Sequence, residues 1–212
     1  MKITAISDLH GDMPKLSGGD LLIVAGDLTA RDREDEYYKF NSWLCDQEYD
    51  KKIVIAGNHD MLLQKDWFQY LEGCPAFDYL EDSFTEYKGL KIWGTPWSRW
   101  FEGVNPDCAA FMLKSEFELM NRFDLIPEDT DILVSHSPCY GRLDKALYGD
   151  LAGSTALRDR VDYLRTKRLR YHFHGHIHEA YGVHEEGELK TFNVARMDRS
   201  YIPRNKIVNI EM

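Results

Sequence analysis

The sequence predicts an α/β protein in which short buried strands alternate with amphipathic helices. Several short aliphatic runs end in a glycine or serine followed by a polar residue, which is typical of buried strands. These runs cover residues 3–7, 21–26, 53–57 and 132–135, and residues 90–94 form a weaker one. Helical patterns lie between the runs, and this alternation predicts largely parallel strand connections.

Three segments have the pattern of helices. Residues 31–47 place large apolar side chains on one face and charges elsewhere, as expected of a helix that packs on a core. Residues 107–121 and 154–166 also predict helices. Ser154 stands at the start of the last segment, where its hydroxyl would cap the first turn.

The last quarter of the chain has a different pattern. Four consecutive runs read as strands, with residues 185–188 as a hairpin turn; the runs cover residues 171–174, 180–184, 191–194 and 207–210. This arrangement predicts a second, more antiparallel sheet. The chain shows no linker, repeat or low-complexity segment, so we expect residues 1–212 to form a single domain.

Composition limits the partners. The net charge of −10 disfavours tight binding to duplex nucleic acid or to anionic lipid. No apolar stretch is long enough to span a membrane, and we expect no signal peptide. The cysteines are widely spaced, so we expect reduced thiols and a cytoplasmic location; they are Cys45, Cys74, Cys108 and Cys139.

Candidate metal ligands follow nearly every predicted inner strand. In open α/β sheets, ligands bind beyond the carboxyl ends of the strands. Here those ends carry carboxylate, carboxamide or imidazole groups that short loops would bring together. The candidates are Asp8, His10, Asp27, Asn58, His136, His176 and His178.

This set of side chains predicts two metal sites. Two carboxylates, one carboxamide and four imidazoles are too many for one tetrahedral ion and suit two ions that share a ligand. Such donors favour Mn, with Fe, Zn, Ni or Co as alternatives, over Ca. Asp27 is the natural bridge. Alone, Asp8 could cap a helix and Asp27 could stand in a turn; it is their shared placement that favours metal binding.

A phosphate ester is the expected substrate. Two dications and two carboxylates leave an excess of about two positive charges, which attracts a phosphoryl group despite the acidic surface. Two metals roughly 3.5–4 Å apart can hold the attacking and leaving oxygens and supply hydroxide at neutral pH. His59 lies beside Asn58 and could protonate the leaving oxygen. Asp60 could orient His59.

Substrate contacts are harder to predict. Residues 96–101 contain Trp97, Trp100 and Arg99, which could stack on a base and grip phosphate. The alternative is an aromatic lid packed on the core. Arg142, in the loop after the fourth strand, could also touch substrate.

The ordered blocks resemble the calcineurin-like metallophosphoesterase family, and most of all its compact metallophosphoesterase-domain subfamily. The blocks are D-x-H at Asp8, G-D at Asp27, G-N-H-D at Asn58, a lone His136, and G-H-x-H at His176. The resemblance covers nearly the whole chain. It implies a four-layer αββα sandwich of two mixed β-sheets, with the metals at one edge.

The resemblance also implies roles for individual residues. Asp27 would join two sets, one with Asp8, His10 and His178 and the other with Asn58, His136 and His176. His59 would be the leaving-group acid. Some vertebrate members of the subfamily have glycine at the position of His176, whereas this chain keeps the histidine. We therefore expect it to hold both metals.

The leading hypothesis is a phosphodiesterase, with cyclic nucleotides among the substrates that the resemblance implies. A phosphomonoesterase or a protein serine/threonine phosphatase on the same site is the alternative, because both reactions use the same metal clamp. A non-catalytic interaction module on this fold is a third hypothesis; such modules usually lack ligands that this chain retains. A nuclease is disfavoured by the negative charge.

Overall fold

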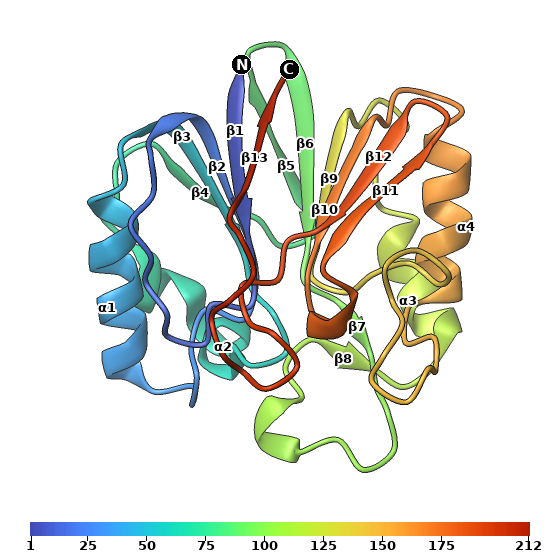
Figure 1. Cartoon of the computed structure of the whole chain (residues 1–212), viewed down its shortest axis with the longest axis horizontal. Coiled ribbons are helices and arrows are strands. Elements are labelled where there is room, and N and C mark those ends of the chain that lie inside the picture. Colours follow the sequence, from blue (N-terminus) through green and yellow to red (C-terminus); the bar gives the residue numbers. More distant parts are fainter.

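The computed structural model describes residues 1–212 as two β-sheets stacked face to face, with helices on both outer faces (Figure 1). The predicted four-layer αββα sandwich is confirmed. Strand alternation explains the stacking: successive side chains point to opposite faces, so one face of each sheet packs on the other sheet and one on helices.

The first sheet has the strand order β13-β1-β2-β3-β4. Four strands run parallel and the last strand of the chain pairs antiparallel with β1. The strands are β1 (Lys2–Ile6), β2 (Gly19–Ala25), β3 (Tyr49–Ile55), β4 (Phe77–Tyr79) and β13 (Val208–Glu211). Helices α1 (Glu34–Cys45) and α2 (Met61–Leu71) pack on its outer side (Figure 1).

The second sheet has the order β11-β12-β10-β9-β6-β5, with parallel pairs inside and one antiparallel pair at each edge. Helices α3 (Glu116–Phe123) and α4 (Thr155–Leu164) lie on its outer side (Figure 1). Its strands are β5 (Ser83–Tyr87), β6 (Leu90–Thr95), β9 (Ile132–Ser135), β10 (Tyr171–His174), β11 (Gly182–Glu186) and β12 (Leu189–Asn193). Smaller elements are β7 (Ser98–Arg99), β8 (Met112–Leu113), and the 3₁₀ helices η1 (Pro106–Cys108) and η2 (His178–Ala180).

The predicted sheet of the last quarter needs correction. All four strands exist, but β13 joins the first sheet, and β10 pairs parallel with β12. Only Gly187 and Glu188 form the hairpin turn, because Glu185 and Glu186 belong to β11. Strand β13 covers the free edge of β1, which would otherwise expose unpaired backbone groups.

The predicted helix over residues 107–121 is wrong in its first half. That half forms η1 and β8, and Phe111 between them has a left-handed φ of 53° that a helix cannot contain. Helix α3 begins only after Ser115, whose hydroxyl accepts a hydrogen bond from the Glu118 backbone. The predicted cap at Ser154 is confirmed, because its side chain accepts a hydrogen bond from Leu157 N at 3.1 Å.

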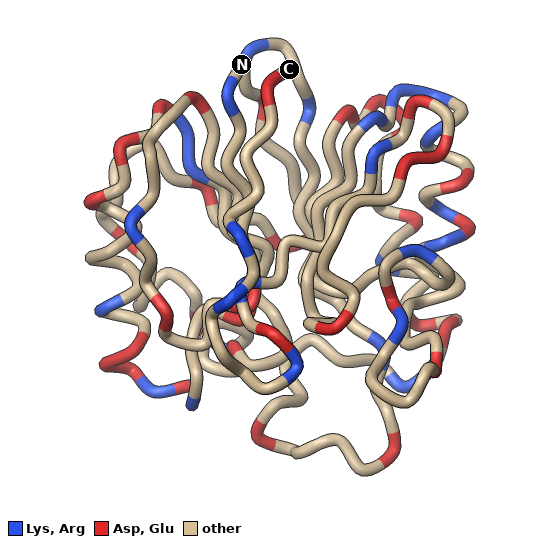
Figure 2. Tube along the Cα trace, viewed as in Figure 1, with Lys and Arg blue, Asp and Glu red and all other residues tan.

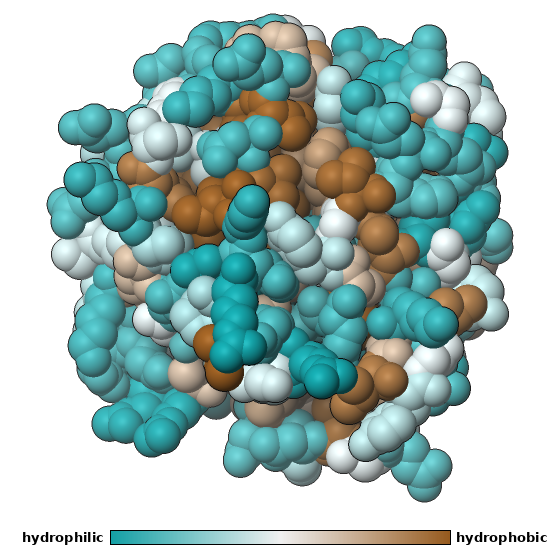
Figure 3. All heavy atoms as spheres, in the orientation of Figure 1, coloured by the Kyte–Doolittle hydropathy of each residue, from teal (hydrophilic) through white to brown (hydrophobic).

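The core between the sheets is aliphatic and aromatic. Ile23 and Ile55 of the first sheet and Val134 and Phe173 of the second belong to one buried cluster. Charged residues lie mostly along the outer helices and the loops (Figure 2). On the face in Figure 3, apolar side chains reach the surface in the band between the sheets. No helix is both long and apolar enough to cross a membrane.

We predict that Phe173→Ala lowers the free energy of unfolding by about 3–5 kcal/mol, because it leaves a cavity between the sheets. Phe173 is 0% exposed and its ring stacks on Phe192 at 5.1 Å. Urea denaturation of the metal-free protein measures the change. Phe84→Ala, at a side chain that is 50% exposed, is the control. Equal losses in the two variants would contradict the packing described here.

Candidate metal centre

The carboxyl ends of five strands meet at one end of the sandwich, at the lower end in Figure 1. Each strand is followed at once by one or more of the polar residues that the sequence indicated. Asp8 and His10 follow β1, Asp27 follows β2, Asn58, His59 and Asp60 follow β3, His136 follows β9, and His176 and His178 follow β10. The structure thus brings together side chains that lie up to 170 positions apart, from Asp8 to His178.

Unusual backbone conformations turn these side chains toward one another. Asp8, His10, Asp27 and His176 all have left-handed φ values, of 52°, 42°, 54° and 69°. Such values are uncommon outside glycine and persist where the surroundings enforce them. The enforcing contacts include hydrogen bonds from Asp8 N to Gly26 O (2.9 Å) and from His10 N to Asp27 O (3.0 Å).

Two glycines make room for the carboxylates. A Cβ atom at Gly175 would lie 2.0 Å from Asp8 Oδ2, and one at Gly57 would lie 2.2 Å from Asp27 Oδ1. Any other residue at either position would displace a carboxylate. Both glycines stand inside motifs that the sequence analysis used, but their role as the space for the carboxylates appears only in three dimensions.

The first cluster contains Asp8, His10 and His178. His178 Nε2 lies 3.2 Å from Asp8 Oδ1, and His178 Nδ1 faces the carbonyl of Asp198 at 3.3 Å. His10 Nε2 lies 3.6 Å from Asp27 Oδ2, and it is buried with no hydrogen-bond partner. Buried polar atoms are nearly always bonded, so this nitrogen is placed for a group other than a protein side chain.

The second cluster contains His136, Asn58 and His176. His136 Nδ1 is 2.9 Å from the Ala25 carbonyl, and Asn58 Nδ2 donates to the Cys108 carbonyl at 2.8 Å. With Nδ1 as the donor to the Ala25 carbonyl, Nε2 of a neutral His136 ring presents a lone pair to Asn58 Oδ1 at 2.9 Å. His176 Nδ1 lies 2.8 Å from the same oxygen. Two acceptors that face each other in a buried site repel unless a cation lies beside them, so these residues fit a metal ion.

Asp27 lies between the clusters. Its Oδ2 faces His10 Nε2 at 3.6 Å, and its Oδ1 faces His136 Nε2 at 3.4 Å. The residue is 2% exposed. Oδ1 also accepts a hydrogen bond from the His59 backbone at 2.9 Å. One carboxylate therefore presents a different oxygen to each group of imidazoles.

The pKa values of the site follow from burial and from these contacts. Burial lowers the pKa of His10 to about 4 and that of His176 to about 3, so both rings are neutral at pH 7. Burial also disfavours the charged form of His178, but its hydrogen bond with Asp8 and the charges of Asp8 and Asp27 together outweigh burial and raise the pKa of His178 to about 9. Burial would raise the pKa of Asp8, yet the hydrogen bond with His178 and the surrounding imidazoles together hold it well below its usual range.

The predicted role of Asp60 needs correction. Asp60 does not contact His59; it accepts hydrogen bonds from Gly57 N at 2.8 Å and from Leu28 N at 3.1 Å. It therefore ties the loop after β2 to the loop after β3. Burial and the charge of Asp27 raise the pKa of Asp60 well above its usual range. The ring of His59 is partly exposed and packs edge-on against His10 at 4.6 Å.

Arg142 is also corrected, because the structure keeps it away from the centre. Its guanidinium is buried (the residue is 1% exposed), binds Glu186 at 2.6 Å and also pairs with Asp162. A buried guanidinium with two carboxylate partners is not available to substrate.

In the aromatic loop after β6, Trp97 packs on the core, whereas Arg99 and Trp100 are partly exposed. Trp97 is 7% exposed and its indole nitrogen donates to Asp82 at 2.7 Å. Trp100 lies under the ammonium of Lys114, and Arg99 lies beside Phe101. No hydrogen bond, ion pair or ring contact joins Trp97, Arg99 or Trp100 to the candidate ligands.

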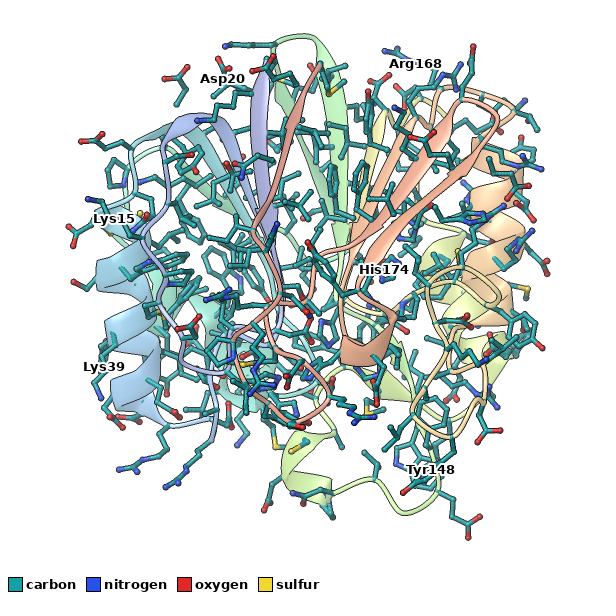
Figure 4. All side chains as sticks on the ribbon, viewed as in Figure 1. Lys15, Asp20, Lys39, Tyr148, Arg168 and His174 are labelled. Atoms are coloured by element: carbon teal, nitrogen blue, oxygen red, sulfur yellow. The ribbon has the colours of Figure 1, made fainter.

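Two histidines of β10 lie outside the cluster. His172 Nε2 contacts Ser135 Oγ at 2.7 Å, and His174 Nδ1 contacts the Gly175 carbonyl at 3.3 Å. In Figure 4 the labelled His174 lies inside the fold on β10, whereas Lys39 and Tyr148 point outward. Neither histidine belongs to a group of side chains that could hold a metal ion.

Tyr201, which no sequence motif indicates, also borders the site. Its ring lies edge-on to His10 at 5.0 Å and to His178 at 4.9 Å. Tyr201 stands in the loop that follows β12, a parallel strand whose end lies beside that of β10. The rule that strand ends carry site residues, applied to this strand as well, would have pointed to the loop.

The sandwich fold and this cluster of carboxylate, carboxamide and imidazole groups at its strand ends define a metallophosphoesterase, a class of metal-dependent phosphoester hydrolases. The family model for calcineurin-like phosphoesterases matches residues 1–180. The chain belongs to the calcineurin-like phosphoesterase family.

Relatives resemble the chain over its length. It is 33% identical to metallophosphoesterase domain-containing protein 1 of Homo sapiens, over all of this chain and 71% of that protein. It is 30% identical to UPF0046 protein T07D4.2 of Caenorhabditis elegans, over 98% of this chain and 59% of that protein. A solved structure superposes with a TM-score of 0.68 at 14% identity, over 91% of this chain and 89% of the other; it supports the fold alone.

We predict that metal binding at pH 7 displaces one proton from His178. Because the pKa of His178 is about 9, the metal-free protein holds this proton at pH 7 and loses it as the pH rises through 9. Metal affinity should therefore rise with pH over this interval, since a cation competes with the proton. Calorimetric titration with Mn²⁺ in two buffers of different ionisation enthalpy measures proton release.

The matched control is His178→Asn. The wild type should release about one proton more than the variant at pH 7, because only a ligand that is protonated beforehand must lose its proton. The difference should vanish above pH 9. Equal release by the two proteins at pH 7 would contradict this assignment.

Proposed function

We propose that the protein hydrolyses phosphodiesters at a centre of two divalent cations bridged by Asp27. The placement of Asp27 carries the proposal. Its two oxygens face nitrogens of two separate imidazole groups, at 3.6 Å and 3.4 Å, inside a buried site. A carboxylate with one oxygen for each site suits a pair of cations roughly 3.5–4 Å apart.

The ligands divide into two sets that share this residue. Asp8, His10, Asp27 and His178 would hold one cation, and Asp27, Asn58, His136 and His176 would hold the other. The unbonded His10 Nε2 supports the first set, and the facing lone pairs of His136 and Asn58 support the second. Mixed nitrogen and oxygen donors suit Mn²⁺, our choice, and also Fe, Zn, Ni or Co.

His59 is the proposed proton donor to the leaving oxygen. Two bound cations would supply positive charge for the phosphoryl group and activate a water molecule as nucleophile. The His59 backbone is fixed by its hydrogen bond to Asp27 Oδ1, while its ring is partly exposed at the mouth of the site. An imidazole in this place can give a proton to the departing oxygen. Asp60 holds the loop after β2 to the loop after β3 through its hydrogen bonds with Leu28 N and Gly57 N.

The charge of the surface away from the metal centre disfavours monoesters more than diesters. The chain has a net charge of −10, and an acidic surface repels a dianionic monoester more than a monoanionic diester. The free state of all four cysteines suits a reducing compartment such as the cytoplasm. The substrate would be a small phosphate ester.

We predict that the Mn²⁺-loaded protein cleaves bis-(p-nitrophenyl) phosphate and that His59→Ala lowers kcat about 10²–10⁴-fold, the usual contribution of a general acid. Bound metal, measured by elemental analysis, should not change, because His59 is not assigned as a ligand. His184→Ala, at a histidine with a 42% exposed side chain, is the control.

Comparison of the diester with the monoester p-nitrophenyl phosphate separates the alternative functions. Faster cleavage of p-nitrophenyl phosphate than of the diester would make the protein a phosphomonoesterase or protein phosphatase. A metal-loaded protein that cleaves neither ester would refute a hydrolytic function and favour an interaction module.

We predict that Asp27→Asn empties both metal sites, because an amide offers one oxygen where the carboxylate offers two and removes one negative charge. After dialysis, elemental analysis should find about two metal equivalents in the wild type, the number expected for a bridged pair. The variant should hold near zero. Asp107→Asn, on η1, is the control. Retention of one full equivalent would show that Asp27 serves a single site.

A further inference from the structure

The loop of residues 195–206, which we call the Tyr201 loop, closes one side of the metal centre. It follows β12 and lies beside the ends of β1 and β10, in orange to red at the lower end of Figure 1. Tyr201 contacts His10 and His178, and His59 also contacts His10. Tyr201 and His59 therefore both border the site beside His10.

The two ends of the Tyr201 loop are tied down. Asn205 Nδ2 donates to the carbonyls of Ala195 (3.0 Å) and Met197 (2.8 Å), which closes the base of the loop. Arg196 Nε binds Asp12 Oδ2 at 2.8 Å. The Arg196 contact attaches the base of the loop to the segment that carries His10. The position of the Tyr201 loop relative to His10 is therefore fixed.

The tip of the loop is organised by Asp198. Its Oδ1 accepts hydrogen bonds from Ser200 N (2.8 Å) and Ile202 N (3.1 Å), on both sides of Tyr201. The Asp198 carbonyl faces His178 Nδ1 at 3.3 Å. Tyr201 itself has a left-handed φ of 56°, which is unfavourable for a bulky side chain. The ring is thus held over the imidazoles by the loop around it.

Tyr201 covers the imidazoles only in part. It is 58% exposed, although it touches two candidate ligands that are themselves nearly buried. A ring that served only to shield these imidazoles would be more stable with most of its apolar surface buried. The exposed part of the ring is therefore a surface at the mouth that a bound molecule could cover.

We propose that Tyr201 contacts the organic group of the phosphate ester and makes the protein prefer esters that carry a planar aromatic group. The proposal rests on the proposed function, because it needs the phosphoryl group at the metal centre. With the phosphoryl group beside His10 and His178, the organic group lies within reach of the ring. Aromatic side chains bind planar groups by stacking or edge contact and discriminate little among them.

Two ligands that cannot be hydrolysed test the proposal, phenylphosphonate and methylphosphonate, titrated by calorimetry into the Mn²⁺-loaded protein. The wild type should bind phenylphosphonate about tenfold more tightly, a typical effect of one aromatic contact. Tyr201→Ala should bring the two affinities to within about twofold by weakening phenylphosphonate alone. Tyr201→Phe should keep the preference, because it keeps the ring. Tyr38→Ala, at a tyrosine of α1 that is 51% exposed, is the control.

Each other outcome overturns the proposal in a distinguishable way. If the wild type binds both phosphonates equally, the role of Tyr201 is refuted while the proposed function stands. If Tyr201→Ala loses metal or weakens both ligands equally, Tyr201 supports the ligand histidines and does not select substrate. If neither phosphonate binds the metal-loaded wild type, the proposal fails, and cleavage of bis-(p-nitrophenyl) phosphate by the same sample then decides whether the proposed function stands.

Discussion

The structure depends on the burial of carboxylates among imidazoles at one end of two sheets. Asp8 is 0% exposed and Asp27 is 2% exposed, and burial of a charge costs several kcal/mol unless the charge is compensated. The protein compensates with directed contacts, such as the 3.0 Å hydrogen bonds from His176 N to both oxygens of Asp8. Two local features keep these contacts in place. The left-handed residues turn the side chains inward, and Gly57 and Gly175 leave space for the carboxylates that a Cβ would fill.

Much of the site could be predicted because it obeys one rule. Parallel strands bring their carboxyl ends to a common edge, so the polar residues after β1, β2 and β3 meet in one sheet and those after β9 and β10 in the other. Stacking of the two sheets with these edges at the same end brings both groups together. The stacking of two mixed sheets followed from the resemblance, whereas the strand pattern placed β13 in the second sheet, which the structure corrects. The partner of β13 could not be predicted, because an amphipathic edge strand carries no signal for which edge it joins.

Individual side-chain roles were harder to predict where the deciding partner lies elsewhere in the chain. The sequence predicts an Arg142 that is available to substrate, but Asp162 and Glu186, 20 and 44 residues away, bind its guanidinium. The Trp97 indole donates a hydrogen bond to Asp82. Asp60 accepts a hydrogen bond from the Leu28 backbone instead of orienting the adjacent His59. Sequence neighbours suggested each wrong role. The buried ion cluster of Arg142 instead joins the loop after β9 to α4 and β11, and so supports the loop that begins at His136.

The wide spacing of the ligands along the chain has a consequence for how the protein folds. Asp8 meets the backbone of His176 across 168 residues, and β1 pairs with β13 near the end of the chain. Contacts of such long range give a high contact order, which slows folding because a large loop must close before any contact forms. No partly folded chain that lacks β10 can assemble the ligand set, so metal binding would stabilise only the completed fold.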